Sequence, residues 1–154
     1  MRLTNLLSPR AVISPLKVTT KKQALLELAD KAGELSGVQP REIFDALLQR
    51  ERLGSTGIGD GVAIPHGKLA RLESIVGVFA RLDHPIDFDA LDGAPVDLIF
   101  MLITPEASGA DHLKALACAA RMLRDPATVS AIRGTRDSGA LYALISGQSQ
   151  NEAA

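Results

Sequence analysis

The chain has 154 residues, of which 46% are apolar and 23% charged, with a net charge of -1 at pH 7. This length suits one ordinary domain, and this balance excludes a disordered, fibrous or coiled-coil protein. The 17 basic residues form no long run that could cover a nucleic-acid backbone, and only 3% of residues are aromatic, with no Trp to stack on bases. Nucleic acid is therefore not an expected partner.

The cysteine content and the apolar runs indicate the compartment. Cys118 is the single cysteine and cannot form an internal disulfide, and the first residues lack the pattern of a signal peptide. The longest apolar run, 96–103, falls far short of the roughly 20 residues that cross a bilayer. We expect a cytoplasmic protein with no membrane insertion.

The first twenty residues contain short apolar pieces separated by Pro9 and Pro15, which predicts a brief helical turn followed by an extended segment. Thr20 and Gln23 then have the spacing of a capping box at a helix start. Apolar residues recur behind them at helical spacing and predict an amphipathic helix over about 20–36. Its apolar stripe comprises Ala24, Leu25, Leu28, Ala29, Ala32 and Leu35.

A second helix begins at Pro40, which suits the first helical position, and ends near 49–52, before Gly54. Its apolar stripe comprises Ile43, Phe44, Leu47 and Leu48. The glycine-dense segment 54–68 follows, with one short apolar piece at 62–64. This composition predicts turns in place of regular structure.

Two apolar stretches rich in β-branched residues, 75–82 and 96–103, predict central strands separated by turn-rich sequence. Further helices are predicted over 111–124, 125–132 and 138–145. The inner face of the helix at 111–124 is predicted to carry Leu113, Leu116, Ala117, Ala120 and Leu123. Helices both before and after the strands predict an α/β fold in which helices pack on a sheet.

The glycine-dense segment fails both standard nucleotide-binding patterns. Residues 57–62 lack the third glycine of the dinucleotide fingerprint at its proper offset, and residues 61–69 have one residue too many between the glycines for a P-loop. A zinc site built from His66, His112 and an aspartate is disfavoured, because the sequence has no close metal-ligand pair and no cysteine cluster. We expect neither a cofactor nor a metal.

His66 lies between Pro65 and Gly67 at the end of the apolar piece, with Lys68 close by, so its imidazole is held on a stiff turn. A histidine with an ordinary pKa of about 6.5 is largely neutral in the cytosol, and its ring nitrogen is a good nucleophile toward phosphorus. On spacing alone, His66 fits either a phosphoryl acceptor or a residue that only orders the turn.

The segment 50–69, which reads RERLGSTGIGDGVAIPHGKL, closely resembles the active-site motif of the IIA proteins of the bacterial phosphotransferase system. The resemblance is to the fructose/mannitol/nitrogen family, and most of all to its nitrogen-regulatory type. Segments 85–100 and 111–116 resemble later parts of the family in the same order, so the similarity covers roughly residues 3–147. It implies a single α/β domain over 1–147, with a mixed sheet of about five strands flanked by helices on both faces, and a polar C-terminal tail over 148–154.

The same resemblance implies a phosphorelay protein that accepts a phosphoryl group on Nε2 of His66 from a histidine phosphocarrier protein of the HPr or NPr type. Its phosphorylation state would regulate target proteins, such as potassium-transport or nitrogen-related proteins. Arg50 and His112 match the family positions that stabilise the phosphoryl group. Without the resemblance, Arg50 or Arg52 could be a cation at a helix end, and His112 could be an ordinary core histidine.

Other functions stay open at this point. A sugar-specific IIA component would pass its phosphoryl group to a IIB protein, and a non-catalytic binding or sensor module would use His66 only to order a loop. A hydrolase built on His66 and His112 would lack an evident carboxylate pair or metal set. Lys68 fits a partner-contacting surface residue, His84 an exposed turn residue, and Cys118 a small buried packing residue.

Overall fold

The computed structural model describes the backbone of residues 1–153 and the side chains of residues 1–147. Its helices are α1 (Leu3–Leu6), the short 3-10 helix η1 (Pro9–Ala11), α2 (Lys21–Ser36), α3 (Pro40–Glu51), α4 (Ala110–Arg124), α5 (Pro126–Arg133) and α6 (Ser138–Ala153). Its strands are β1 (Val12–Leu16), β2 (Gly57–Gly59), β3 (Val62–Ala63), β4 (His66–Leu69), β5 (Val76–Ile86) and β6 (Val96–Pro105).

The strands form one mixed sheet in the order β1-β5-β6-β3-β2, and β4 also pairs with β6. The central pair, β5 and β6, is antiparallel, whereas β1 runs parallel to β5 and both β3 and β4 run parallel to β6. β3 and β4 lie one after the other along the same edge of β6. β3 pairs with residues 98–99 and β4 with residues 102–105, and the two strands are separated by Ile64 and Pro65. The mixed sheet is confirmed, with six strands where about five were expected.

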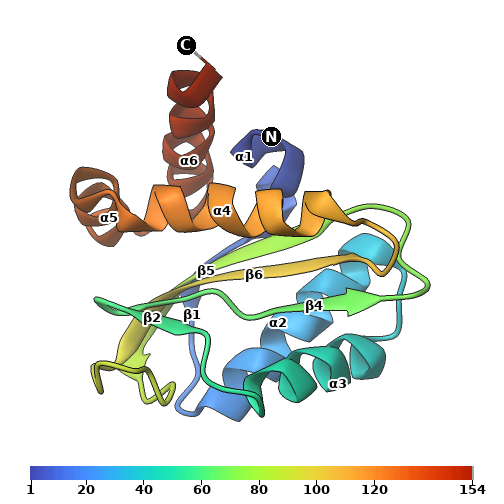
Figure 1. Ribbon diagram of the computed structural model, residues 1–154. Coiled ribbons are helices and arrows are strands. Elements are labelled where there is room, and N and C mark those ends of the chain that lie inside the picture. Colours follow the sequence, from blue (N-terminus) through green and yellow to red (C-terminus); the bar gives the residue numbers. More distant parts are fainter. Residues whose placement is uncertain (154) are drawn as a thin grey trace.

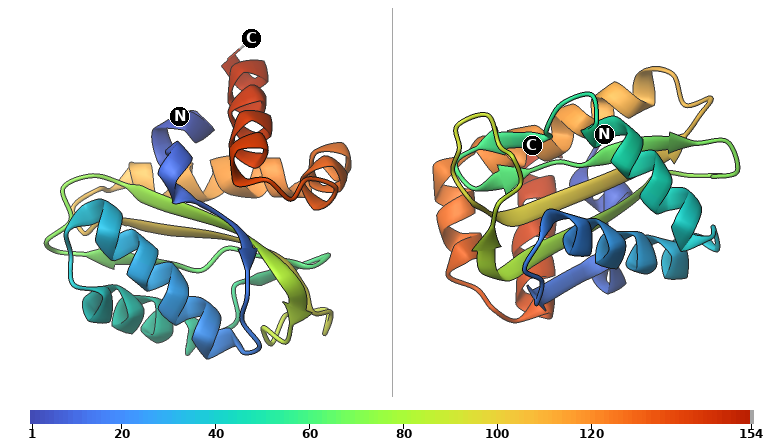
Figure 2. Two further views of the ribbon diagram at one scale, coloured as in Figure 1. Left: turned by 180° about the vertical axis from the view of Figure 1, so that it is seen from behind. Right: turned by 90° about the horizontal axis from the view of Figure 1, so that it is seen from below.

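Helices cover both faces of this sheet, as predicted. Figures 1 and 2 show α2 and α3 side by side on one face, and α4 lying across the other, with α5 at its end and α1 and α6 on the same side of the sheet. Each face has its own apolar core. Leu28, Ile43, Leu47, Val78 and Ile99 belong to the first, and Leu3, Phe79, Phe100, Leu102 and Ile132 to the second.

The first two long helices match their sequence signals. Thr20 caps α2 by accepting a hydrogen bond from the backbone N–H of Gln23 at 3.1 Å, and the Gln23 side chain accepts one from the N–H of Thr19 at 2.9 Å. Five of the six residues of the predicted stripe on α2 are buried. Strong periodicity made both helices predictable, together with the capping Thr20 at the start of α2 and Pro40 at the first position of α3.

Three boundaries differ from the prediction. The segment 54–68 contains β2, β3 and the start of β4. β3 and β4 are held by backbone hydrogen bonds to β6, which lies far along the chain, and a glycine-rich sequence does not predict such pairing. β5 continues to Ile86 through sequence that reads as turns, with His84 exposed on it. The backbone of α6 continues past Ile145 to Ala153, and Ala154 lies outside the described residues.

The predicted inner face of α4 is only partly correct. Leu123 is buried and Leu116 and Ala120 are partly buried against the second core, but Leu113 is 69% exposed and Ala117 is also at the surface. The buried residues are His112, Ala115, Cys118, Ala119, Met122 and Leu123. The segment is rich in Ala and Leu on all sides, so its periodicity does not distinguish neighbouring stripes. The correct stripe begins at His112, which places this imidazole between the helix and the sheet.

Within the described chain, no helix is long and apolar enough to cross a bilayer.

Candidate functional site

His66 is the first residue of β4, directly after Ile64 and Pro65, which separate β3 from β4. Its Nδ1 lies 2.9 Å from the carbonyl oxygen of Ile64. Because a carbonyl oxygen only accepts, Nδ1 carries the ring proton and donates it to this bond. The neutral imidazole therefore presents Nε2 as a bare nitrogen, that is, one that carries no proton.

Arg50, in the last turn of α3, faces this bare nitrogen. Its Nε–H donates to Nε2 of His66 at 3.3 Å, and its Nη1 donates to the carbonyl oxygen of Gly54 at 2.9 Å. The second bond anchors the guanidinium on the turn that follows the helix. Arg52, the other candidate in the motif, lines a separate groove between α2 and α3.

Close packing of α3 against β4 brings Arg50 to His66. A Cβ on Gly67 would lie 3.2 Å from the Cβ of Ala46 and 3.4 Å from its backbone carbon, so glycine allows an approach that another residue would hinder. Ala46 and Arg50 are four residues apart and lie on the same face of the helix. The small residues at this contact thus set the distance from the guanidinium to the imidazole.

Glu51, buried beside Arg50, fixes the turn beyond α3. Its side chain is 3% exposed and lies 2.9 Å from Nζ of Lys21. It also accepts hydrogen bonds from the backbone N–H of Thr56 at 3.1 Å and from the Thr56 hydroxyl. Sequence reasoning missed this residue, because a glutamate between two arginines at a helix end reads as a solvated residue.

His112 approaches from the opposite face of the sheet, in the first turn of α4. Its ring centroid lies 5.6 Å from that of His66, with the two ring planes at 57°. The structure therefore brings together all three residues singled out in the sequence: Arg50, His66 and His112. They come from α3, β4 and α4, elements that lie apart along the chain.

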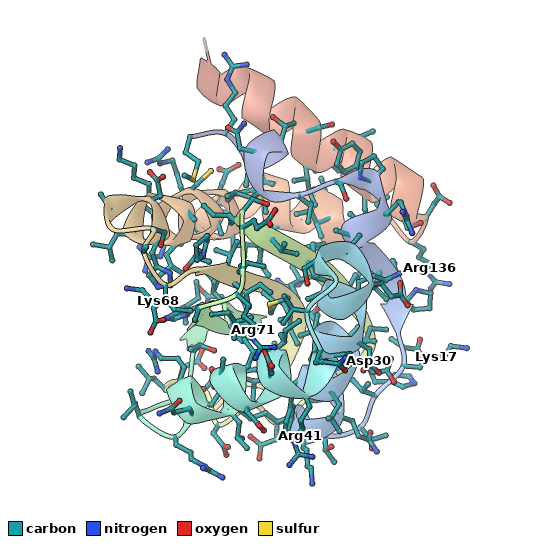
Figure 3. The ribbon with its side chains drawn as sticks, turned by 90° about the vertical axis from the view of Figure 1, so that its right-hand side faces the viewer. Lys17, Asp30, Arg41, Lys68, Arg71 and Arg136 are labelled. Carbon is teal, nitrogen blue, oxygen red and sulfur yellow. The ribbon has the colours of Figure 1, made fainter. Side chains whose placement is uncertain are left out.

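The three side chains share a shallow depression of about 450 Å³, which is also lined by Lys68, Leu53, Ala46, Gln49 and Gly67. Leu53 is 83% exposed at this rim. Lys68 extends from β4 toward solvent (Figure 3). The depression thus has a charged floor and a partly apolar rim open to an approaching molecule.

The environment favours neutral imidazoles. Burial lowers the pKa of His66, and the nearby charge of Arg50 lowers it further, against the opposing effects of the Ile64 hydrogen bond and the Glu51 carboxylate. Burial also lowers the pKa of His112, aided by the charge of Lys68 and, when His66 is protonated, by that of the His66 ring. A neutral His66 keeps the lone pair on Nε2 available for bond formation.

Among the described side chains, no three His, Cys, Asp or Glu residues are arranged to hold a metal ion. The chemistry of the depression is thus that of a bare imidazole nitrogen beside an arginine fork and a second imidazole. These groups fit a phosphoryl group, whose oxygens accept hydrogen bonds from arginine and imidazole N–H donors.

Fold and site together define a IIA protein, and the comparison of families agrees. The chain belongs to the phosphoenolpyruvate-dependent sugar phosphotransferase system EIIA 2 family, whose model matches residues 5–148. It is 57% identical over 145 residues to the nitrogen regulatory protein of Bradyrhizobium diazoefficiens, covering 94% of this chain and 95% of that one. It is 38% identical over 146 residues to the nitrogen regulatory protein of Escherichia coli, covering 94% and 90%.

Solved structures agree with this assignment. The nitrogen regulatory protein IIA-Ntr from Neisseria meningitidis superposes with a TM-score of 0.88 at 32% identity, covering 93% of this chain and 98% of that one. IIA mannitol from Escherichia coli shares the fold, with a TM-score of 0.77 at 20% identity over 90% and 98% of the chains. The family and fold predicted from the sequence are confirmed, and the chain is a phosphotransferase-system component of the nitrogen regulatory group.

We predict that stability falls when the pH drops below the ordinary histidine range. Both imidazoles have lowered pKa values in the folded protein, so the unfolded chain binds more protons between those values and about 6.5. Their contribution is therefore fully present above about pH 6.5 and decreases as the pH falls through this window. Urea unfolding between about pH 7.5 and about pH 5 measures this change, since the unfolded-chain histidine pKa of about 6.5 lies within this range.

The control for this prediction removes the imidazoles themselves. The double variant His66→Gln/His112→Gln should show a flatter dependence of unfolding free energy on pH than the wild type. A wild-type stability that rises on acidification through this window would contradict the lowered pKa values.

Proposed function

We propose that this protein is a cytoplasmic phosphorelay component that accepts a phosphoryl group on Nε2 of His66 from a histidine phosphocarrier protein of the HPr or NPr type. Its phosphorylation state then regulates target proteins, such as potassium-transport or nitrogen-related proteins. The observation that carries the proposal is the bare Nε2 of His66, which faces the Arg50 guanidinium at 3.3 Å in an open depression.

The transfer needs only groups that line the depression. The lone pair on Nε2 of His66 attacks the phosphorus atom, and the N–P bond of the donor breaks as the new one forms, so its electron pair returns to the donor imidazole. The ring of His66 keeps its Nδ1 proton, and the carbonyl of Ile64 stabilises the positive charge that develops on the ring.

Arg50 has a place in both states of the site. Its Nε–H donates to Nε2 of His66 before transfer, and a phosphoryl group formed there brings acceptor oxygens within reach of the same guanidinium. The bond from Nη1 to Gly54 keeps the guanidinium from leaving the site between the two states. In this account, Arg50 orients the acceptor and then neutralises the transferred charge.

The regulatory part of the proposal follows from where the charge is added. A phosphoryl group adds about -1.5 to -2 charges at neutral pH, which changes the surface that a docked protein would meet. Exposed Leu53 at the rim of the depression would contact such a partner. The similarity to nitrogen regulatory proteins favours regulation over a sugar-specific role, in which the group would pass to a IIB protein.

We predict that intact-mass analysis after incubation with phosphoenolpyruvate and the first two relay proteins detects one acid-labile phosphoryl group. His66→Ala should gain none, because it removes the nucleophile. A known IIA acceptor serves as the positive control for the relay. A wild-type chain that stays unmodified while the control is phosphorylated would favour a non-catalytic module, and sugar-dependent loss of the phosphoryl group in extract would favour the sugar-specific role.

We predict different effects for the two arginines of the motif. Arg50→Gln should slow phosphoryl acceptance on the order of a hundredfold, the usual cost of removing one donor to a developing oxyanion. Arg52→Gln is the matched control and should stay near the wild-type rate, since Arg52 lines a different groove. Quenched-flow measurement of phosphoprotein formation compares the two, and equal rates for both variants would contradict the role of Arg50.

A further inference from the structure

Thr104 contacts the imidazole of His112 from inside the molecule. It lies near the end of β6, its side chain is 0% exposed, and its Oγ1 is 2.6 Å from Nδ1 of His112. It faces the same side of the sheet as Leu102, two residues before it, whose Cα pairs in register with that of His66. Thr104 is thus placed under the second imidazole of the site.

The direction of this hydrogen bond follows from what the hydroxyl can reach. A buried hydroxyl keeps its proton in a hydrogen bond, because an unsatisfied buried donor costs about 1–3 kcal/mol. Among the described residues, Nδ1 of His112 is the one hydrogen-bond partner of the Thr104 hydroxyl. The hydroxyl therefore donates and Nδ1 accepts, which leaves the ring proton of a neutral His112 on Nε2.

We propose that Thr104 is a positioning residue that holds His112 as the Nε2–H tautomer and so makes it a hydrogen-bond donor for a phosphoryl group on His66. The catalytic half of this inference rests on the function proposed above. The tautomer half rests on the geometry of the unmodified protein.

The two imidazoles then have opposite tautomers that suit their opposite tasks. His66 has its proton on Nδ1, bonded to Ile64, and presents a bare Nε2 as nucleophile. His112 has its proton on Nε2 and presents a donor, which phosphoryl oxygens need because they only accept. With the opposite tautomer, His112 would present a lone pair to the phosphoryl oxygens and repel them.

The environment of His112 supports the neutral form on which this assignment depends. The residue is 9% exposed, and burial, aided by the positive charge of Lys68, lowers its pKa. The hydroxyl of Thr104 can also hydrogen-bond a protonated His112. If His112 takes up a second proton beside a charged phosphoryl group, the hydroxyl can turn and accept from Nδ1–H.

The first test is ¹⁵N NMR of the histidine side chains in the unphosphorylated protein near neutral pH. We expect the Nδ1 signal of His112 at the position of an unprotonated ring nitrogen and its Nε2 signal at that of an N–H. The opposite pattern for His66 provides an internal comparison. A protonated Nδ1 with an unprotonated Nε2 on His112 would overturn the proposal, whatever the protein does in a relay.

The second test uses two substitutions at the same position. Thr104→Val keeps the size of the side chain and removes the hydroxyl, so the Nδ1–H tautomer of His112 should become populated. Phosphoryl acceptance on His66 should fall on the order of tenfold, as when the residue that orients a functional histidine is lost. Thr104→Ser keeps the hydroxyl and should retain the wild-type tautomer and a rate within a few-fold of wild type.

Thr128→Val is the control for loss of a buried hydroxyl elsewhere, since Thr128 is 3% exposed on α5, which follows the opposite end of α4. It should leave the acceptance rate unchanged even if stability falls. A Thr104→Val protein that is folded, keeps the Nε2–H tautomer and accepts phosphate at the wild-type rate would overturn the proposal. A wild-type chain that accepts no phosphate would overturn the proposed function and the catalytic half, while the NMR result still decides the tautomer.

Discussion

The hydrogen bond from Nδ1 of His66 to the carbonyl of Ile64 is the constraint on which the site depends. It joins residues only two positions apart, across a proline that lacks a donor of its own. The bond fixes both the orientation of the ring and the position of its proton, so the bare nitrogen always faces the depression. Arg50, the rim and the second imidazole are useful only because this nitrogen is held there.

The sheet makes the rest of the geometry possible, because His66 is the residue at which β4 begins its pairing with β6. α3 reaches His66 from one face through the contact of Ala46 with Gly67, and α4 brings His112 from the other. The site is therefore held by two separate cores. Buried Glu51, paired with Lys21, fixes the turn to which Arg50 is anchored and adds a negative charge close to the cationic floor.

The sequence predicted what is encoded locally. α2 and α3 begin at a capping threonine and at a proline and have clear apolar stripes. The family resemblance of segments 50–69 and 111–116 identified the three residues that meet in the depression. The strands within 54–68 escaped prediction because their partners are distant along the chain. The buried face of α4 was not predicted correctly, because alanine and leucine occur on all faces of this helix. Glu51 and Thr104 act through buried contacts that spacing along a chain does not reveal.

The position of the phosphoryl group on the ring of His66 tests the central claim most directly. After phosphorylation of ¹⁵N-histidine-labelled protein, the coupling between phosphorus and nitrogen in NMR spectra identifies the ring nitrogen that carries the group. The account predicts coupling to Nε2 of His66, with Nδ1 still protonated and bonded to Ile64. Coupling to Nδ1, or to a nitrogen of His112 or His84, would contradict it.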